Sequence, residues 1–292
     1  MAEKTSTKTE SPTGSTGTLT QLFLGLLWLG TTMWTAHATI NGAGADASGP
    51  IGAAAAALPG VIAATLVTGA SIGHAAGGRF SGPFGRLLAG LGMGALFGLA
   101  VAAGIRFAYG SDPAITKLAM IVGVASVVGG ALAILPDKVL DAGLWATTWV
   151  FFAGIMFGVL QKPLLDLLGG AEATTRFVYI QSIVTGLFAA LQGYRWLVWG
   201  RPNVAWHFVA GALPGVLLLV AEYLTRLGGS SLSAIVNGYS ADNPALVDAT
   251  EFTRLRHALI VLLVGGFVTM VSAVIFRARK DDSSAFDAID SD

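Results

Sequence analysis

The stretch that decides the fold lies near the C-terminus, at residues 255–280, and reads LRHALIVLLVGGFVTMVSAVIFRARK. No charged residue occurs between residues 258 and 276. A run of this length can cross a bilayer as one helix, which takes about 20 residues. Three basic residues follow at once, Arg277, Arg279 and Lys280. Because Lys and Arg are retained on the cytoplasmic side, this run predicts a transmembrane helix whose C-terminal end is cytoplasmic.

The composition extends this interpretation to the whole chain. Of its 292 residues, 54% are hydrophobic and only 12% are charged, whereas about a quarter of a soluble domain is charged. Most of the exterior must therefore face a lipid bilayer. The 17 basic and 17 acidic residues balance, so no overall field favours nucleic acid. The absence of cysteine excludes disulfides and thiolate metal sites.

Seven further apolar runs precede this C-terminal run in the chain, and each is close to the length of a membrane span. They cover residues 19–40, 51–77, 84–109, 114–135, 144–168, 174–199 and 204–227. Together the runs predict an all-α, polytopic integral membrane bundle of about eight transmembrane helices. We expect a disordered cytoplasmic tail at residues 1–18, a transmembrane helical domain at 19–276 and a polar cytoplasmic tail at 277–292.

An even number of spans places both termini on one side of the membrane. The loops on that side carry more Lys and Arg than the others, which favours cytoplasmic termini. An Ala- and Gly-rich composition with more Arg than Lys hints at a bacterial plasma membrane. The pattern Ala36-His37-Ala38 leaves an alternative open. Cleavage there, as of a signal peptide, would leave seven spans.

The pentapeptide ALPGV occurs twice, at residues 57–61 and 212–216, each time inside an apolar run. Proline removes a backbone donor from a helix, and the following glycine adds freedom. The two runs are five spans apart, so they cross the bilayer in opposite directions. Interrupted helices in two halves point to a transporter's central site. This predicts an inverted repeat of spans 1–3 and 6–8, with Pro59, Gly60, Pro214 and Gly215 along a substrate path. The alternative is chance recurrence, with each proline a simple kink.

Three ionisable residues within the runs are further candidates, since ionisable groups in a membrane are commonly functional. Glu222, in the seventh run, is added to the substrate path; the alternative is a local ion pair with Arg226 at i+4. His74 and His207 lie near the cytoplasmic ends of the second and seventh runs and are possible proton or polar sites.

The chain lacks two motifs of common catalytic sites. It contains no H-E-x-x-H and no phosphate-binding G-x-x-x-x-G-K-[ST] sequence. We therefore expect no metal, no cofactor and no enzymatic activity.

Two functions are consistent with these features. The first is a transporter or permease that moves a small molecule or lipid across the plasma membrane, supported by the paired Pro-Gly segments. The alternative is a non-catalytic scaffold or accessory subunit of an envelope, division or transport complex. Protein partners, or a second copy of this chain, would bind its cytoplasmic tails or its G-x-x-x-G faces. These motifs begin at Gly73, Gly94 and Gly154, and within the chain we expect them to let neighbouring helix backbones approach closely.

Overall fold

The computed structural model describes residues 13–42, 49–109, 113–170, 172–198, 203–236 and 244–289. Within these ranges the chain is helical, with no strand, which confirms the predicted fold class. The α-helices are α1 (Thr13–Gly42), α2 (Gly49–Gly77), α3 (Pro83–Tyr109), α4 (Pro113–Ala131), α5 (Asp137–Leu168), α6 (Ala173–Leu197), α7 (Val204–Val236) and α8 (Pro244–Ile289). A 3-10 turn, η1 (Leu132–Ile134), joins α4 to Pro136, which precedes α5.

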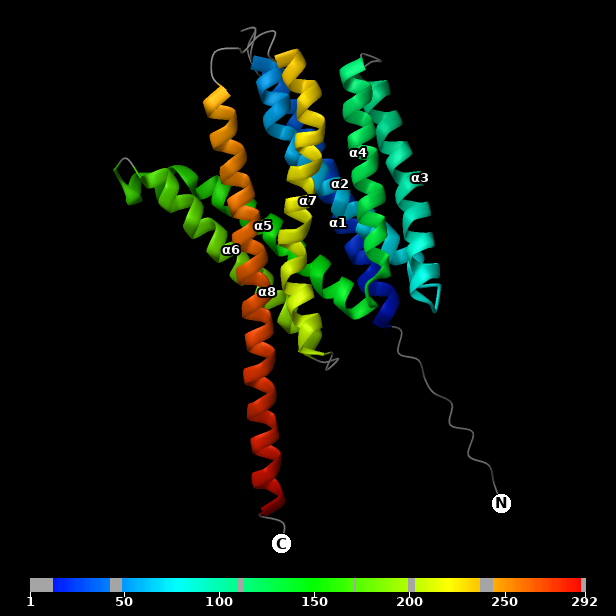
Figure 1. The fold of residues 1–292 in the computed structure, drawn as a ribbon, viewed down its shortest axis with the longest axis vertical. Helices are drawn as coiled ribbons and strands as arrows, with labels where there is room; N and C mark the ends of the chain where they lie inside the picture. The colour runs from blue at the N-terminus through cyan, green and yellow to red at the C-terminus, as the bar shows by residue number, and fades with distance from the viewer. Residues whose placement is uncertain are drawn as a thin grey trace.

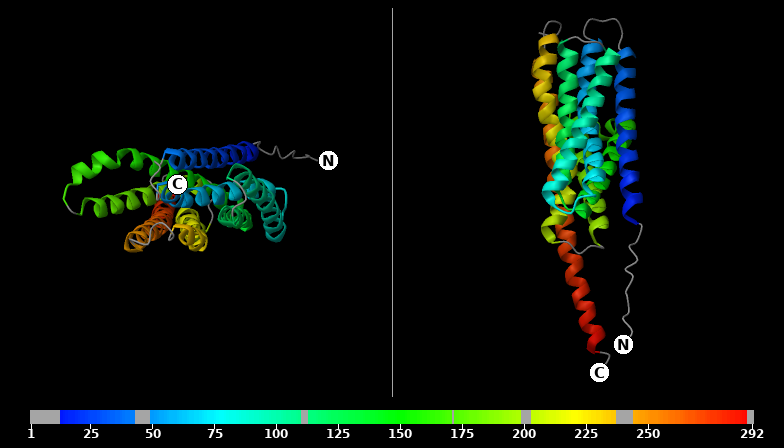
Figure 2. Two further views of the ribbon diagram at one scale, coloured as in Figure 1. Left: turned by 90° about the horizontal axis from the view of Figure 1, so that it is seen from above. Right: turned by 90° about the vertical axis from the view of Figure 1, so that its right-hand side faces the viewer.

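The helices run alternately up and down the bundle (Figure 1). We call the end at which α1, α3, α5 and α7 begin the basal end, and the opposite end the apical end. α8 leaves the bundle at the basal end and continues beyond it, as Figure 2 also shows. The hairpin of α5 and α6 leans outward from the others. α1 therefore begins, and α8 leaves, at the same end, as an even number of helices requires.

Seven of the eight α-helices in the described ranges are long and apolar enough to cross a membrane. The chain is therefore a polytopic membrane protein. α1 has 30 residues but is not among these seven; Gln21 and several threonines, Thr31, Thr32 and Thr35 among them, interrupt its apolar run. Each of Thr31, Thr32 and Thr35 donates its hydroxyl hydrogen bond to a carbonyl of α1 itself, which satisfies it without water. That α1 also crosses the membrane remains a prediction.

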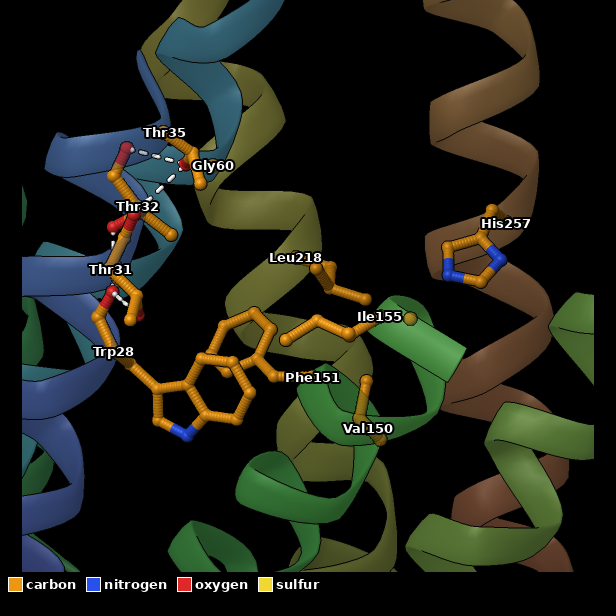
Figure 3. Close-up of a pocket in the computed structure, with 12 residues that line it drawn as sticks. Trp28, Thr31, Thr32, Thr35, Gly60, Val150, Phe151, Ile155, Leu218 and His257 are labelled. Atoms are coloured by element: carbon orange, nitrogen blue, oxygen red, sulfur yellow. Dashed lines mark hydrogen bonds between the residues drawn. The ribbon is translucent and has the colours of Figure 1, made fainter. Parts of the chain in front are cut away.

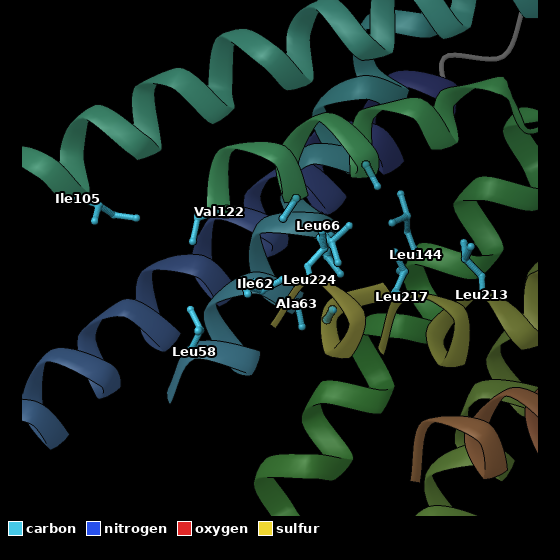
Figure 4. Close-up of a cluster of buried hydrophobic side chains, with 14 of the residues drawn as sticks. Leu58, Ile62, Ala63, Leu66, Ile105, Val122, Leu144, Leu213, Leu217 and Leu224 are labelled. Carbon is cyan, nitrogen blue, oxygen red and sulfur yellow. The ribbon is translucent and has the colours of Figure 1, made fainter. Parts of the chain in front are cut away.

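α2 lies at the centre of the bundle. Its membrane-spanning part is 78% buried, whereas that of α3 is only 22% buried and exposes large apolar side chains outward. The main core cluster gathers apolar side chains of α2, α4, α5 and α7 around Leu66, Leu144 and Leu217 (Figure 4). α2 thus provides the framework on which the other helices are placed.

Glycines bring α2, α3 and α4 into backbone contact. A Cβ atom on Gly129 of α4 would overlap the carbonyl oxygen of Leu66 in α2, and one on Gly90 of α3 would overlap that of Gly130. In lipid, such close approach replaces the hydrophobic effect as the source of helix association. The predicted packing role of the motifs that begin at Gly73 and Gly94 is confirmed, since both glycines lie against α4.

The third predicted packing motif behaves differently. Neither Gly154 nor Gly158 of α5 has a neighbouring heavy atom within 4 Å of the position of a Cβ. The reason is the tilt of α5, whose second half leans away from the other helices (Figure 1). Contact between copies of this chain through that face remains a prediction.

The packing order repeats from one half of the chain to the other. α2 packs on α1, α3 and α4, as α6 packs on α5, α7 and α8, and the pair α3–α4 corresponds to α7–α8. The motif LVTG (residues 66–69) in α2 matches IVTG (residues 183–186) in α6. The glycine that ends each motif packs on the fourth helix of its half, at Ser126 or Val264. The halves differ in that α5 also contacts α7.

This order does not match the predicted inverted repeat of spans 1–3 and 6–8. α6 packs extensively on α8, whereas α1 makes no comparable contact with α3, because α3 uses its glycine face on α4. Helices four apart in the chain, such as α2 and α6, run in the same direction (Figure 1). The repeat that the packing supports is therefore parallel.

Two helices extend into the predicted polar tails. α1 begins at Thr13 and α8 continues to Ile289, although tails were predicted at residues 1–18 and 277–292. Adding residues to an existing helix needs no new nucleation, so polar residues next to an apolar run can continue it. Residues 1–12 and 290–292 of these tails lie outside the described residues.

We predict that the same substitution destabilises the protein at one glycine of α3 and has little effect at another. Gly90→Leu places a side chain against the α4 backbone and should destabilise the protein by about 1–3 kcal/mol, the usual cost of overpacking. Gly92→Leu is the control, because Gly92 is exposed and has nothing within 4 Å. Thermal unfolding of both variants in detergent is the measurement. Equal midpoints would contradict close packing of α3 on α4.

Candidate functional site

A cavity of about 360 Å³ lies between α1, α2, α5, α7 and α8, in the apical half of the bundle (Figure 3). Its walls include Thr31 and Thr35 of α1, Gly60 of α2, Phe151 of α5, Leu218 of α7 and His257 of α8. Several of these residues are exposed, Thr31, Gly60 and Ile155 among them. The cavity is therefore partly open to the surroundings of the bundle.

The cavity walls are mainly apolar. Val150, Phe151, Ile155 and Leu218 contribute hydrocarbon surface, and the ring of Trp28 packs on that of Phe151 with their centroids 5.6 Å apart. The threonine hydroxyls of α1 are engaged with carbonyls of their own helix. Such a cavity suits an apolar molecule or an apolar chain.

His257 is the main polar feature of the cavity wall. Its Nδ1 lies 2.7 Å from the hydroxyl of Ser182 in α6. That hydroxyl also donates to the carbonyl of Val178, one turn earlier, at 2.6 Å. The other ring nitrogen, Nε2, faces the side of the cavity on which Leu218 and Ile155 lie (Figure 3). The cavity therefore contains one fixed imidazole among apolar groups.

Glu222 lies one helical turn from Leu218, on the apical side of the cavity. It is 4% exposed and binds Arg254 of α8, whose Nε lies 3.0 Å from one carboxylate oxygen. Arg226, the partner expected from the sequence, lies farther away, with its Nε 3.8 Å from the other carboxylate oxygen of Glu222. Glu222 thus joins α7 to α8 beside the cavity and does not line it.

A second ionic cluster joins four helices at the basal end. His74 of α2 is 5% exposed, and its Nε2 lies 2.9 Å from the carboxylate of Asp141 in α5. Asp137, at the first turn of α5, pairs with Arg86 of α3. Gln21 of α1 donates to the backbone carbonyl of Asp141. The cluster fixes the start of α5 against α1, α2 and α3.

The two predicted histidines do not form one site. His207 is buried in α7, with its Nδ1 3.3 Å from the carbonyl of Asn203 and its ring near that of Tyr194. His74 instead lies with the acids of α5. Both histidines lie toward the basal end, but each contacts different groups, so their role as proton or polar sites stays a prediction.

The two Pro-Gly pairs also lie in different surroundings. α2 and α7 both continue through their prolines without a break. Gly60 lines the cavity, whereas Gly215 is buried and a Cβ there would overlap Leu262 of α8. Pro59 is half-buried and Pro214 is buried. Of these four predicted path residues, only Gly60 reaches the cavity.

Sequence reasoning missed much of the site. Trp28, Phe151 and His257 belong to no sequence motif that marks a site. Asp137 and Asp141 did carry a signal, since two acids at i, i+4 follow Pro136 at a helix start. Their partner His74 lies far away in the chain, so the pairing itself had no local signal.

Comparison of the chain with protein families, with curated proteins and with solved structures finds no match. Within the part of the chain that the structure describes, no group of three or more His, Asp or Glu side chains could hold a metal ion. The geometry of the cavity and of the two ionic clusters therefore carries the functional argument.

We predict that Glu222 is coupled more strongly to Arg254 than to Arg226. Double-mutant cycles with Glu222→Gln, Arg254→Gln and Arg226→Gln test this through unfolding midpoints in detergent. The Arg254 pair is closer, so its coupling should reach about 1 kcal/mol, against less than about 0.5 kcal/mol for the partly exposed Arg226 pair. A larger coupling to Arg226 would contradict the geometry.

Proposed function

We propose that this protein is a membrane transporter that moves a lipid-like molecule, with the cavity as its binding site. The observation that carries the proposal is the cavity itself, which is apolar, partly open and bordered by five helices from both halves of the chain. A packed scaffold has no need of such a space, since unfilled apolar cavities cost stability.

The size of the cavity limits its occupant. Small-molecule sites commonly measure about 300–1,000 Å³, and this one lies near the lower limit at about 360 Å³. A single apolar chain fits this space better than a two-chain phospholipid. We therefore take a single-chain lipid as the substrate class.

The two ionic clusters lie at opposite ends of the bundle and support the same function. The Glu222–Arg254 pair joins α7 to α8 on the apical side, and the His74–Asp141 pair joins α2 to α5 at the basal end. A transporter has to separate its helices at one end at a time. These contacts suit such a change, because each has one partly exposed partner, Arg254 or Asp141, that water can reach when the helices separate.

The proposed location is the plasma membrane, with the basal end in the cytoplasm. The supporting feature is the basic sequence Arg277, Arg279 and Lys280, which follows the membrane-spanning part of α8 at the basal end. Reporter fusions at either terminus should therefore report the cytoplasm.

We predict that filling the cavity stops transport. Purified protein in vesicles should speed the transbilayer movement of a lysophospholipid that carries a fluorescent NBD group, measured by dithionite bleaching. Gly154→Trp puts a ring into the cavity and should reduce the rate to that of protein-free vesicles. Gly158→Trp is the matched control, one turn further along α5 with nothing within 4 Å and no part in the cavity.

The same assay separates the alternative function. α8 continues past the end of its membrane-spanning part to Ile289, and this extension favours an accessory subunit that recruits a partner. Such a subunit would move no lipid when purified alone, and both tryptophan variants would then behave like the native chain. That outcome would overturn the transporter proposal.

A further inference from the structure

We propose that the cavity selects a ligand with a hydroxyl group, which donates a hydrogen bond to Nε2 of His257. The ligand class is an uncharged, single-chain apolar alcohol, for example of the isoprenoid type. This inference rests on the proposed function only in taking the cavity as a ligand site. It adds the polar group by which the site recognises its ligand.

The hydrogen bonds of Ser182 fix the tautomer of His257. A serine hydroxyl has one proton, and here it is donated to the carbonyl of Val178 at 2.6 Å. The contact between Ser182 and Nδ1 of His257, at 2.7 Å, then requires the proton to be on Nδ1. A neutral imidazole with its proton on Nδ1 has an acceptor at Nε2. That nitrogen faces the cavity (Figure 3).

An acceptor in apolar surroundings favours a ligand that donates. Leaving such a group unpaired costs free energy, and the walls near it, such as Leu218 and Ile155, have no side-chain donor. A hydroxyl satisfies Nε2, whereas an ether or an ionised carboxylate has no proton to give. Sites built around one hydrogen bond discriminate strongly against analogues that lack it.

The charged side chains nearest in sequence are engaged elsewhere. Arg254 binds Glu222, and the guanidinium of Arg256 lies over the ring of Tyr179 at 4.3 Å and donates to its hydroxyl. Neither is part of the cavity wall. An anionic headgroup therefore has no cation to meet inside the cavity, which is why the proposal names an uncharged ligand.

Ser182 is a positioning residue in this account. It contacts His257 and is fully buried in α6, outside the cavity wall. Ser182→Ala leaves the ring in place but removes the group that keeps the proton on Nδ1. The imidazole can then carry its proton on Nε2 instead, and Nε2 no longer accepts a hydrogen bond from the ligand. The preference for a hydroxyl should therefore weaken, while apolar binding persists.

The test uses tritiated farnesol bound to the purified full chain in detergent, displaced by unlabelled farnesol or by farnesyl methyl ether. The two competitors share the same chain, but only the alcohol has a proton to donate. On the native protein, farnesol should compete about tenfold better than the ether, as expected for one hydrogen bond. His257→Phe should make the two competitors equal, and Ser182→Ala should reduce the ratio.

Two competition results would overturn the proposal. The first is equal competition by the two compounds on the native protein, a result that depends on no variant. The second is a tenfold preference for farnesol that persists in His257→Phe. A lack of saturable farnesol binding would overturn it too. Movement of the lysophospholipid is measured separately, so transport without hydroxyl preference removes this inference and leaves the proposed function standing.

Discussion

Backbone contact at glycines is the constraint on which the rest of the structure depends. In lipid no hydrophobic force drives helices together, so they associate where small residues allow close packing. In the first half of the chain, Gly129 of α4 packs against α2 and Gly90 of α3 packs against α4; in the second half, Gly211 of α7 packs against Gly265 of α8. The hairpin of α5 and α6 leans outward from the other helices (Figure 1), and the cavity lies beside α5.

The helices were predictable because lipid imposes a simple rule on sequence. A backbone without water must satisfy its own hydrogen bonds, so apolar runs of sufficient length become helices, and each predicted run coincides with one observed helix, although α5 and α8 begin well before the predicted runs. The prolines were harder. Pro59 and Pro214 mark no break, since each helix continues through its proline, and an identical pentapeptide proved compatible with two unlike surroundings.

The site could not be predicted to the same degree, because it depends on the tilt of one hairpin. His257 and Ser182 are 75 residues apart in the chain, and only the packing of α6 on α8 brings them together. Glu222 shows the same limit: the local partner Arg226 is visible at i+4, but the closer partner, Arg254, lies on another helix. Short spacings in sequence reveal contacts within one helix, whereas the contacts of the candidate site are between helices.

The central claim is that the space between α1, α5 and α8 holds a ligand. An electron cryomicroscopy structure of the purified protein in lipid nanodiscs tests it most directly. We expect elongated density for an apolar chain between Trp28, Phe151 and His257, ending within hydrogen-bond distance of Nε2. A structure in which α5 packs on α1 and side chains fill this space would contradict the claim.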